Sequence, residues 1–122
     1  MASESQKFGK NGENEAESYL KEKGFKILAR NWRYKKLEVD LIAMDAEELV
    51  FIEVKARGTD FFGDPESFVS KQKQKNLIAA ANKYIEEANF NGETRFDVVA
   101  ILQNNHKILV NHIQNAFSPS II

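Results

Sequence analysis

The fold is decided by residues 37–56, which read LEVDLIAM, then DAEE, then LVFIEVKA. Two runs rich in apolar and β-branched residues flank four polar or small residues, Asp45 to Glu48. Two such runs separated by a short polar loop are typical of a β-hairpin. The sequence therefore predicts two antiparallel strands, over residues 37–44 and 49–56.

The length of the loop sets which residues of the hairpin face each other. If the loop is symmetric, Asp40 lies opposite Glu53, and Glu38 lies opposite Lys55. Directly opposed residues share one face of the sheet, with Cβ atoms ~4.5–5.5 Å apart. An odd-length loop would shift the pairing by one residue and turn these side chains to the other face. We therefore expect the carboxylates of Asp40 and Glu53 to meet.

The two faces of the hairpin differ in character. One face is wholly apolar: Val39, Leu41, Ala43, Val50, Ile52, Val54 and Ala56. The other face is apolar near the turn and charged at its far end. A strand that is apolar on both faces is usually central in its sheet, so these charges are not freely solvated. Burying them unpaired would cost several kcal/mol, so they need a mutual network or a metal ion.

The charged end of the hairpin suits metal-dependent chemistry. Two neighbouring carboxylates repel each other unless a cation sits between them. Mg²⁺ binds through one or two carboxylates and accepts phosphate oxygens, and Mn²⁺ prefers similar ligands. Lys55 points to the same side as Glu53 and could orient a water or offset phosphate charge. The alternative is a buried ion-pair network, with Glu38 bound to Lys55 and Asp40 partly satisfied by the backbone.

The rest of the chain predicts two helices and three further strands. Residues 8–23 predict a helix with Ala16 and Leu20 on one stripe and Gly24 at its C-terminal end. Glu13 lies on that stripe, which favours a site role over a simple interaction with the helix dipole. The remaining patterns predict a strand over 25–34, a loop over 58–70, a helix over 71–88, and strands over 95–102 and 107–113.

This order, αβββαββ, predicts a single α/β domain with a mixed central sheet flanked by helices. We place the domain at residues 8–116, between a flexible tail over 1–7 and a C-terminal tail over 117–122.

The chain has 122 residues and is 43% hydrophobic with nine Phe, which is enough for one buried core. Without cysteine it forms no disulfide and no thiolate metal site, and it fits a reducing compartment. No long apolar run or signal-peptide core is present, so we expect a cytoplasmic protein without a membrane partner.

Charge is spread unevenly along the chain. The net charge is −1, whereas a protein that coats DNA is normally strongly basic. Residues 26–36 nevertheless contain five basic residues and no acid, and Lys71, Lys73 and Lys75 form a second cluster. Local basic patches around central carboxylates suit an enzyme that grips phosphates. The simpler alternative is that these lysines and arginines are solvated faces of strands and helices.

Taken in order, these residues resemble the YraN-like family of small bacterial proteins, uncharacterised protein family 0102. The resemblance runs from about residue 8 to residue 113. It rests on Gly9-x-x-Gly12-Glu13-x-x-Ala16, Asn31-Trp32-Arg33, Glu38-Val39-Asp40-Leu41-Ile42, Phe51-Ile52-Glu53-Val54-Lys55-Ala56-Arg57 and Arg95-Phe96-Asp97-Val98-Val99. One position departs from the family pattern, because Leu37 stands where the family usually has glycine.

That family is similar to the restriction-endonuclease-like PD-(D/E)xK nucleases, close to archaeal Holliday junction resolvases. The resemblance implies a restriction-endonuclease-like fold and a catalytic lysine, Lys55. It implies that Mg²⁺ or Mn²⁺ is held by Asp40, Glu53, the Val54 carbonyl and Glu13. It also implies that the second helix lends a polar residue to the site, with Lys71 or Gln72 as candidates.

The leading hypothesis is a metal-dependent endonuclease that acts on DNA, at branched or damaged structures. The candidate nucleic-acid-binding residues are Arg33, Lys36, Arg57, Lys71, Gln72 and Lys75. One alternative is a non-catalytic nucleic-acid-binding module on the same fold. Another is a protein-interaction subunit, which predicts a direct pair between Glu38 and Lys55. A nuclease that cuts two strands needs paired sites, which favours a homodimer.

Overall fold

The structure is a computed structural model that describes residues 4–57, 69–104 and 107–119, with side chains in these ranges except those of 4–11, 57 and 104. In chain order its elements are α1 (Glu4–Glu22), β1 (Lys26–Tyr34), β2 (Leu37–Asp45), β3 (Glu48–Arg57), α2 (Lys71–Ala88), β4 (Thr94–Asn104) and β5 (Lys107–Phe117). This confirms the predicted α/β class and the order αβββαββ. The bounds of α2 match the prediction, whereas α1 begins at Glu4 rather than at residue 8.

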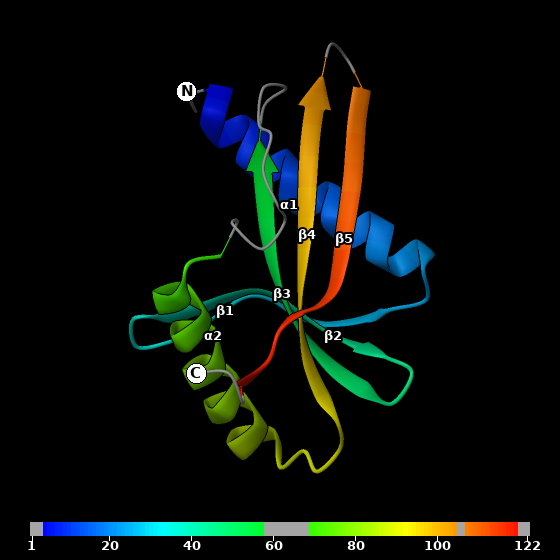
Figure 1. Cartoon of the computed structure of the whole chain (residues 1–122). Coiled ribbons are helices and arrows are strands. Elements are labelled where there is room, and N and C mark those ends of the chain that lie inside the picture. The colour runs from blue at the N-terminus through cyan, green and yellow to red at the C-terminus, as the bar shows by residue number, and fades with distance from the viewer. Residues whose placement is uncertain (1–3, 58–68, 105–106, 120–122) are drawn as a thin grey trace.

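The five strands form one sheet in the order β1-β2-β3-β4-β5, with β3 at its centre. Neighbouring strands are antiparallel except β3 and β4, which run parallel, so the sheet is mixed as predicted. Parallel neighbours need a crossover connection, and α2 lies in that connection. Helix α2 packs beside β1 and β2 on one face, and α1 crosses behind β3 and β4 on the other (Figure 1).

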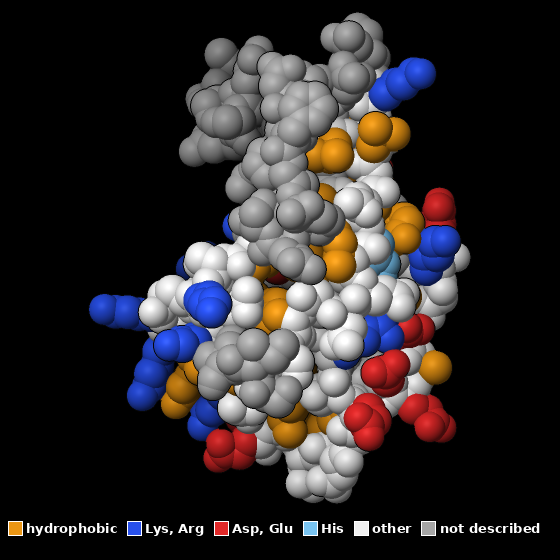
Figure 2. Space-filling view, in the orientation of Figure 1, with side chains coloured by type: hydrophobic (Ala, Val, Ile, Leu, Met, Phe, Trp, Pro, Cys, Tyr) orange, Lys and Arg blue, Asp and Glu red, His pale blue; other side chains and the backbone are white. Residues whose placement is uncertain are grey.

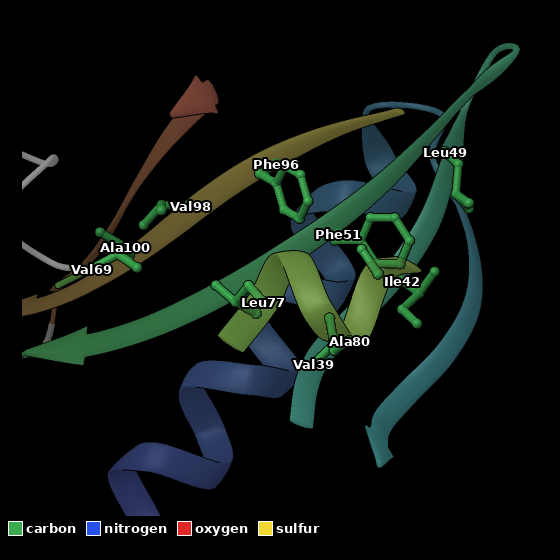
Figure 3. Close-up of a cluster of buried hydrophobic side chains, with 11 residues drawn as sticks. Val39, Ile42, Leu49, Phe51, Val69, Leu77, Ala80, Phe96, Val98 and Ala100 are labelled. Carbon is green, nitrogen blue, oxygen red and sulfur yellow. The ribbon is translucent and has the colours of Figure 1, made fainter. Parts of the chain in front are cut away.

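Alternate residues of β3 enter two separate cores. Leu49 and Phe51 join the core under α2, together with Leu77 of that helix (Figure 3). Val50 and Ile52 join the core under α1. All four side chains are buried, which confirms that β3 is apolar on both faces and central.

The apolar face predicted for the hairpin is wrong for one residue, Val39. The sequence pattern groups Val39 with Leu41, but the structure packs Val39 in the α2 core, next to Ala80 (Figure 3). The paired register of β2 and β3 ends at Leu41 and Ile52, although β2 continues its pairing with β1 back to Leu37. Beyond that point β2 no longer follows β3, so strict alternation across the hairpin stops applying.

Local signals set the ends of both helices. Gly24 has a φ of +94°, and the N–H groups of Gly24 and Phe25 donate to the carbonyls of Lys21 and Leu20. This pattern is a Schellman cap, and its left-handed residue is readily supplied by glycine. At the start of α2, Ser70 Oγ accepts the backbone N–H of Lys73 at 3.1 Å. That cap fixes the first turn of α2, which carries Lys71 and Lys73.

Candidate active site

Asp40 and Glu53 meet where the β2–β3 ladder ends. The observed pairs from Leu41 with Ile52 to Asp45 with Glu48 follow the register predicted from a symmetric loop. Asp40 and Glu53 are next in line, and their carboxyl groups lie close enough to share a hydrogen bond when one of them carries a proton. Asp40 Oδ2 also accepts the backbone N–H of Val54 at 2.9 Å. The carboxylate therefore takes the place of a backbone acceptor at the point where the two strands separate.

The electrostatics of this pair favour a shared proton or a cation. The pKa of Asp40 is raised to about 7, chiefly by burial and then by the hydrogen bond and the negative charge of Glu53. The Val54 N–H and the Lys73 ammonium act in the opposite direction. Near neutral pH, Asp40 is thus poised between its protonated and ionised forms. Two such carboxylates can both be ionised only if positive charge comes close.

One oxygen of this pair lacks a hydrogen-bond donor. Glu53 is buried, and among the described residues its Oε2 atom has no hydrogen-bond partner. The Lys73 Nζ atom approaches Oε2 to 3.4 Å, which is an ion-pair distance without aligned hydrogen-bond geometry. A buried anionic oxygen in this state remains available to a further cation or donor.

Lys73 is the residue that the sequence analysis missed. Lys71 and Gln72 were the candidates from the second helix, and both lie on its exposed side, with Gln72 donating to Asn76 at 3.1 Å. Lys73 precedes the buried Leu77 by one turn, so it lies on the inward stripe of α2. That spacing was a usable signal, because a lysine on a buried stripe needs an acidic partner.

The structure does not form the pair predicted between Glu38 and Lys55. Glu38 Oε2 instead lies 3.5 Å from Arg33 Nη2, and these two residues are register partners across β1 and β2. Lys55 is half-buried, and it forms no ion pair with any acid that the structure describes. The reason is the early end of the β2–β3 ladder, which leaves Glu38 beside β1. The Lys55 ammonium is therefore not neutralised by any of the described acids.

Glu13, on α1, has Arg30 of β1 as its partner. The Cβ of Ala56 lies 2.9 Å from the position that a Cβ on Gly12 would occupy, so only glycine allows α1 this close to β3. The Glu13 Oε2 atom then lies 3.4 Å from Arg30 Nη2. Among the described residues, no three acidic or histidine side chains form a metal-binding group. The structure therefore unites Asp40 with Glu53 but leaves Glu13 bound to Arg30.

Most of the expected nucleic-acid-binding residues are exposed on one side of the molecule. Arg33, Lys36, Lys71 and Lys75 are solvent-exposed on β1, on the turn after it and on the first turns of α2. Figure 2 shows Lys and Arg gathered over α2 and the β1–β2 turn, whereas most of the visible Asp and Glu lie on the opposite side, interspersed with further Lys and Arg. The Arg57 side chain lies outside the described residues.

The donor set fits a hard divalent cation. Mg²⁺ and Mn²⁺ prefer oxygen ligands, and Mg²⁺ is commonly held by one or two carboxylates with waters completing its shell. Asp40 and Glu53 supply such a pair, and the unsatisfied Glu53 Oε2 is the atom that a cation would satisfy. A pair of carboxylates with an adjacent lysine is a set that can support phosphodiester hydrolysis.

A second polar cluster lies on the α1 face of the sheet. The Asp97 carboxylate accepts two hydrogen bonds from Arg95, one from the backbone of Asn115, and lies 2.7 Å from His112 Nε2. Burial alone would raise the pKa of Asp97, but these hydrogen bonds lower it overall. This network of hydrogen bonds and ion pairs satisfies the buried carboxylate of Asp97.

Known proteins match nearly the whole chain. The family described as Uncharacterised protein family UPF0102 matches residues 12–101, which contain Glu13, Asp40, Glu53 and Lys55. A UPF0102 protein of Christiangramia forsetii is 43% identical over 114 residues, covering 93% of this chain and 96% of that protein. A second, of Parabacteroides distasonis, is 38% identical over 109 residues, covering 89% and 90%. A third, of Desulforapulum autotrophicum, is 39% identical over 118 residues, covering 96% and 98%. None of the described helices is long and apolar enough to cross a membrane.

Proposed function

This chain belongs to the uncharacterised protein family UPF0102, and from its own site we propose that it is a metal-dependent endonuclease that hydrolyses DNA phosphodiester bonds, at branched or damaged DNA. The observation that carries the proposal is the adjoining pair of Asp40 and Glu53, with Glu53 Oε2 buried and lacking a hydrogen-bond donor. Such an arrangement costs free energy unless a cation or proton offsets it. The pair therefore makes sense as a site for a divalent cation.

Asp40 and Glu53 would hold Mg²⁺ or Mn²⁺, with the Val54 carbonyl as a further ligand. When bound, the ion would polarise a phosphate oxygen and lower the pKa of a coordinated water. Glu13 is a further carboxylate of the proposal, but its contact with Arg30 would have to be exchanged first. We therefore expect Glu13 to contribute less than Asp40 or Glu53.

The two lysines would have different tasks. Lys55 follows Glu53 by two residues on the same strand, so its ammonium can hold and orient the attacking water or offset charge that develops on the phosphate. Lys73 lies 3.4 Å from Glu53 Oε2, and its positive charge favours the ionised form of Asp40. Each residue acts electrostatically, as expected where catalysis depends on placing positive charge around a phosphate.

The substrate is proposed to be DNA because of the charge distribution around the pair. Arg33, Lys36, Lys71, Gln72 and Lys75 would contact phosphates beside the site, with Arg57 added from the sequence. Phosphate contacts of this kind position a duplex without reading its sequence. A homodimer would supply two sites for the two strands of a branched substrate.

The test is cleavage of labelled four-way-junction, flap, duplex and single-stranded DNA with Mg²⁺ or Mn²⁺. The parent is compared with Asp40→Asn, Lys55→Ala and a control, Lys26→Gln, which changes an exposed lysine at the far end of β1. We expect cleavage by the parent and the control, and loss of at least 100-fold in the other two. No cleavage of any substrate, together with DNA binding that weakens when Mg²⁺ is added, would instead favour a non-catalytic binding module.

A further inference from the structure

Two lysines from different elements converge on the ring of Tyr34. The Lys83 Nζ atom, on α2, lies 4.7 Å from the ring centroid, and the Lys35 Nζ atom, on the β1–β2 turn, lies 5.4 Å from it. Tyr34 is the last residue of β1 and is only partly exposed. The ring attracts both ammonium groups through its electron-rich face. Two positive charges from different elements thus lie around one ring.

Neither lysine has an acidic partner that would explain this arrangement. Among the residues that the structure describes, no carboxylate lies within ion-pair distance of Lys35 or Lys83. Glu86 and Glu87 follow Lys83 by about one turn of α2, yet they form no ion pair with it. Lys35 is further constrained by a left-handed backbone, with a φ of 56°. The two charges are thus partly pre-ordered and available to an anion.

The distance from this group to the candidate active site can be bounded in two ways. Lys73 and Lys83 are ten residues apart on α2, which corresponds to ~15 Å along a helix at ~1.5 Å per residue. Tyr34 pairs with Leu37, three residues before Asp40 on β2, which corresponds to ~10 Å at ~3.3 Å per residue. One strand of duplex DNA carries one phosphate per ~3.4 Å of helix axis. The interval therefore corresponds to roughly three to four nucleotides.

We propose that Tyr34, Lys35 and Lys83 form a phosphate seat that holds the DNA backbone three to four nucleotides from the scissile phosphate. This inference rests on the proposed nuclease function and adds the register in which the substrate lies. The Tyr34 ring pre-orders the two ammonium groups, so less side-chain freedom is lost when a phosphate binds. The seat contacts only the backbone and therefore selects the position and length of a DNA arm, not its sequence.

The experiment measures DNA binding by the Asp40→Asn protein, in which the substrate is not cut. A fluorescent duplex arm or junction is titrated over a range of salt concentrations. Replacing both Lys35 and Lys83 by Gln should reduce the slope of log affinity against log salt by about 2, because two phosphate contacts are lost. Lys26→Gln, which removes one charge far from the seat, should leave the slope unchanged.

Two further variants test the part played by the ring. Tyr34→Phe keeps the ring and should bind DNA like the parent. Tyr34→Leu removes the ring while keeping an apolar side chain, and it should weaken binding several-fold with an unchanged circular dichroism spectrum and melting temperature. Neutral methylphosphonate linkages are placed one at a time along the DNA. A linkage three to four nucleotides from the cleavage position should weaken binding of DNA by the parent. It should have no such effect on the double variant.

The outcomes separate this inference from the function on which it rests. Cleavage and binding by the parent, with salt slopes unaffected by the Lys35 and Lys83 changes, would overturn the seat and leave the nuclease standing. Equal weakening by Tyr34→Phe and Tyr34→Leu would overturn the role of the ring. No binding of any DNA by the parent would overturn both the seat and the nuclease.

Discussion

Asp40→Asn is expected to stabilise the fold at alkaline pH while abolishing cation binding. The pKa of Asp40 is raised to about 7, first by burial and then by the neighbouring Glu53. Asparagine resembles the protonated acid in shape and charge. Its side-chain oxygen can still accept the Val54 N–H, and its amide can donate to Glu53. The variant therefore removes the charge repulsion and keeps the hydrogen bonds.

The magnitude follows from the difference between the folded and unfolded pKa values. Because the folded value is higher, the contribution of Asp40 to stability is fully present below its unfolded pKa and is lost as pH rises through about 7. A shift from 3.8 to about 7 corresponds to a ceiling of about 4 kcal/mol at ~1.4 kcal/mol per unit. Asp40 is half-buried, and solvent screening reduces this to ~2 kcal/mol.

The assay is urea unfolding of the parent and of Asp40→Asn at pH 5 and pH 8.5 in the presence of a chelator. The stability of the variant relative to the parent should rise by about 1 kcal/mol between these two pH values, because pH 5 already lies above the unfolded pKa of Asp40 and part of the ~2 kcal/mol is lost by then. An exposed-acid control, Glu22→Gln, should show no comparable change. Mn²⁺ should raise the melting temperature of the parent at pH 8.5 but not that of Asp40→Asn. The reasoning would be refuted if the variant were less stable than the parent at pH 8.5. It would also be refuted if the difference in unfolding free energy between the two proteins did not increase with pH.

Three further predictions follow from neighbouring contacts. Lys73→Gln removes a cation that lowers the pKa of Asp40, so the pH–rate profile for cleavage should move to higher pH, whereas the exposed Lys75→Gln should leave it in place. Asp97→Asn breaks a buried charge network and should cost ~3–5 kcal/mol in urea unfolding at pH 7. Because the folded pKa of Asp97 is lowered, its charge contributes stability above the unfolded pKa of ~3.9. The difference in unfolding free energy between the parent and Asp97→Asn should therefore shrink as pH falls below that value. Gly12→Ala should cost ~1–3 kcal/mol through a contact with Ala56, and Ala56→Gly in the same chain should recover much of the loss, as measured by thermal unfolding.

Much of the fold could be predicted because local patterns and global topology agree. The two apolar runs on either side of residues 45–48 establish the hairpin, and their apolar character on both faces places β3 at the centre. The symmetric loop also predicts that Asp40 and Glu53 are adjacent. The helical spacing from Lys73 to Leu77 in the same sequence also places Lys73 on the buried stripe of α2.

Other features depend on contacts that no local pattern encodes. The separation of β2 from β3 beyond Leu41 moves Val39 into the other core and pairs Glu38 with Arg33. It follows from β2 continuing along β1, which a hairpin considered alone does not contain. The partner of Glu13 depends likewise on where α1 crosses β1. Tertiary contacts therefore decided the side-chain partners, while periodicity decided the elements.

Ion pairs stabilise the β2–β3 hairpin at its turn, whereas the two strands separate at its far end. At the turn, Arg95 Nη2 lies 2.8 Å from Asp45 Oδ2, and Arg95 Nη1 lies 3.1 Å from Glu48 Oε1. The Arg95 side chain also forms an ion pair with the buried Asp97. Register in a hairpin is set near the turn, and a slip of one residue would turn every side chain to the opposite face. This anchor can hold the register while the far end gives up backbone pairing to accommodate Asp40. The contact between Asp40 and Glu53 can therefore be destabilising by itself. The two residues still lie together, because the contacts of Arg95 at the turn stabilise the register of the same two strands.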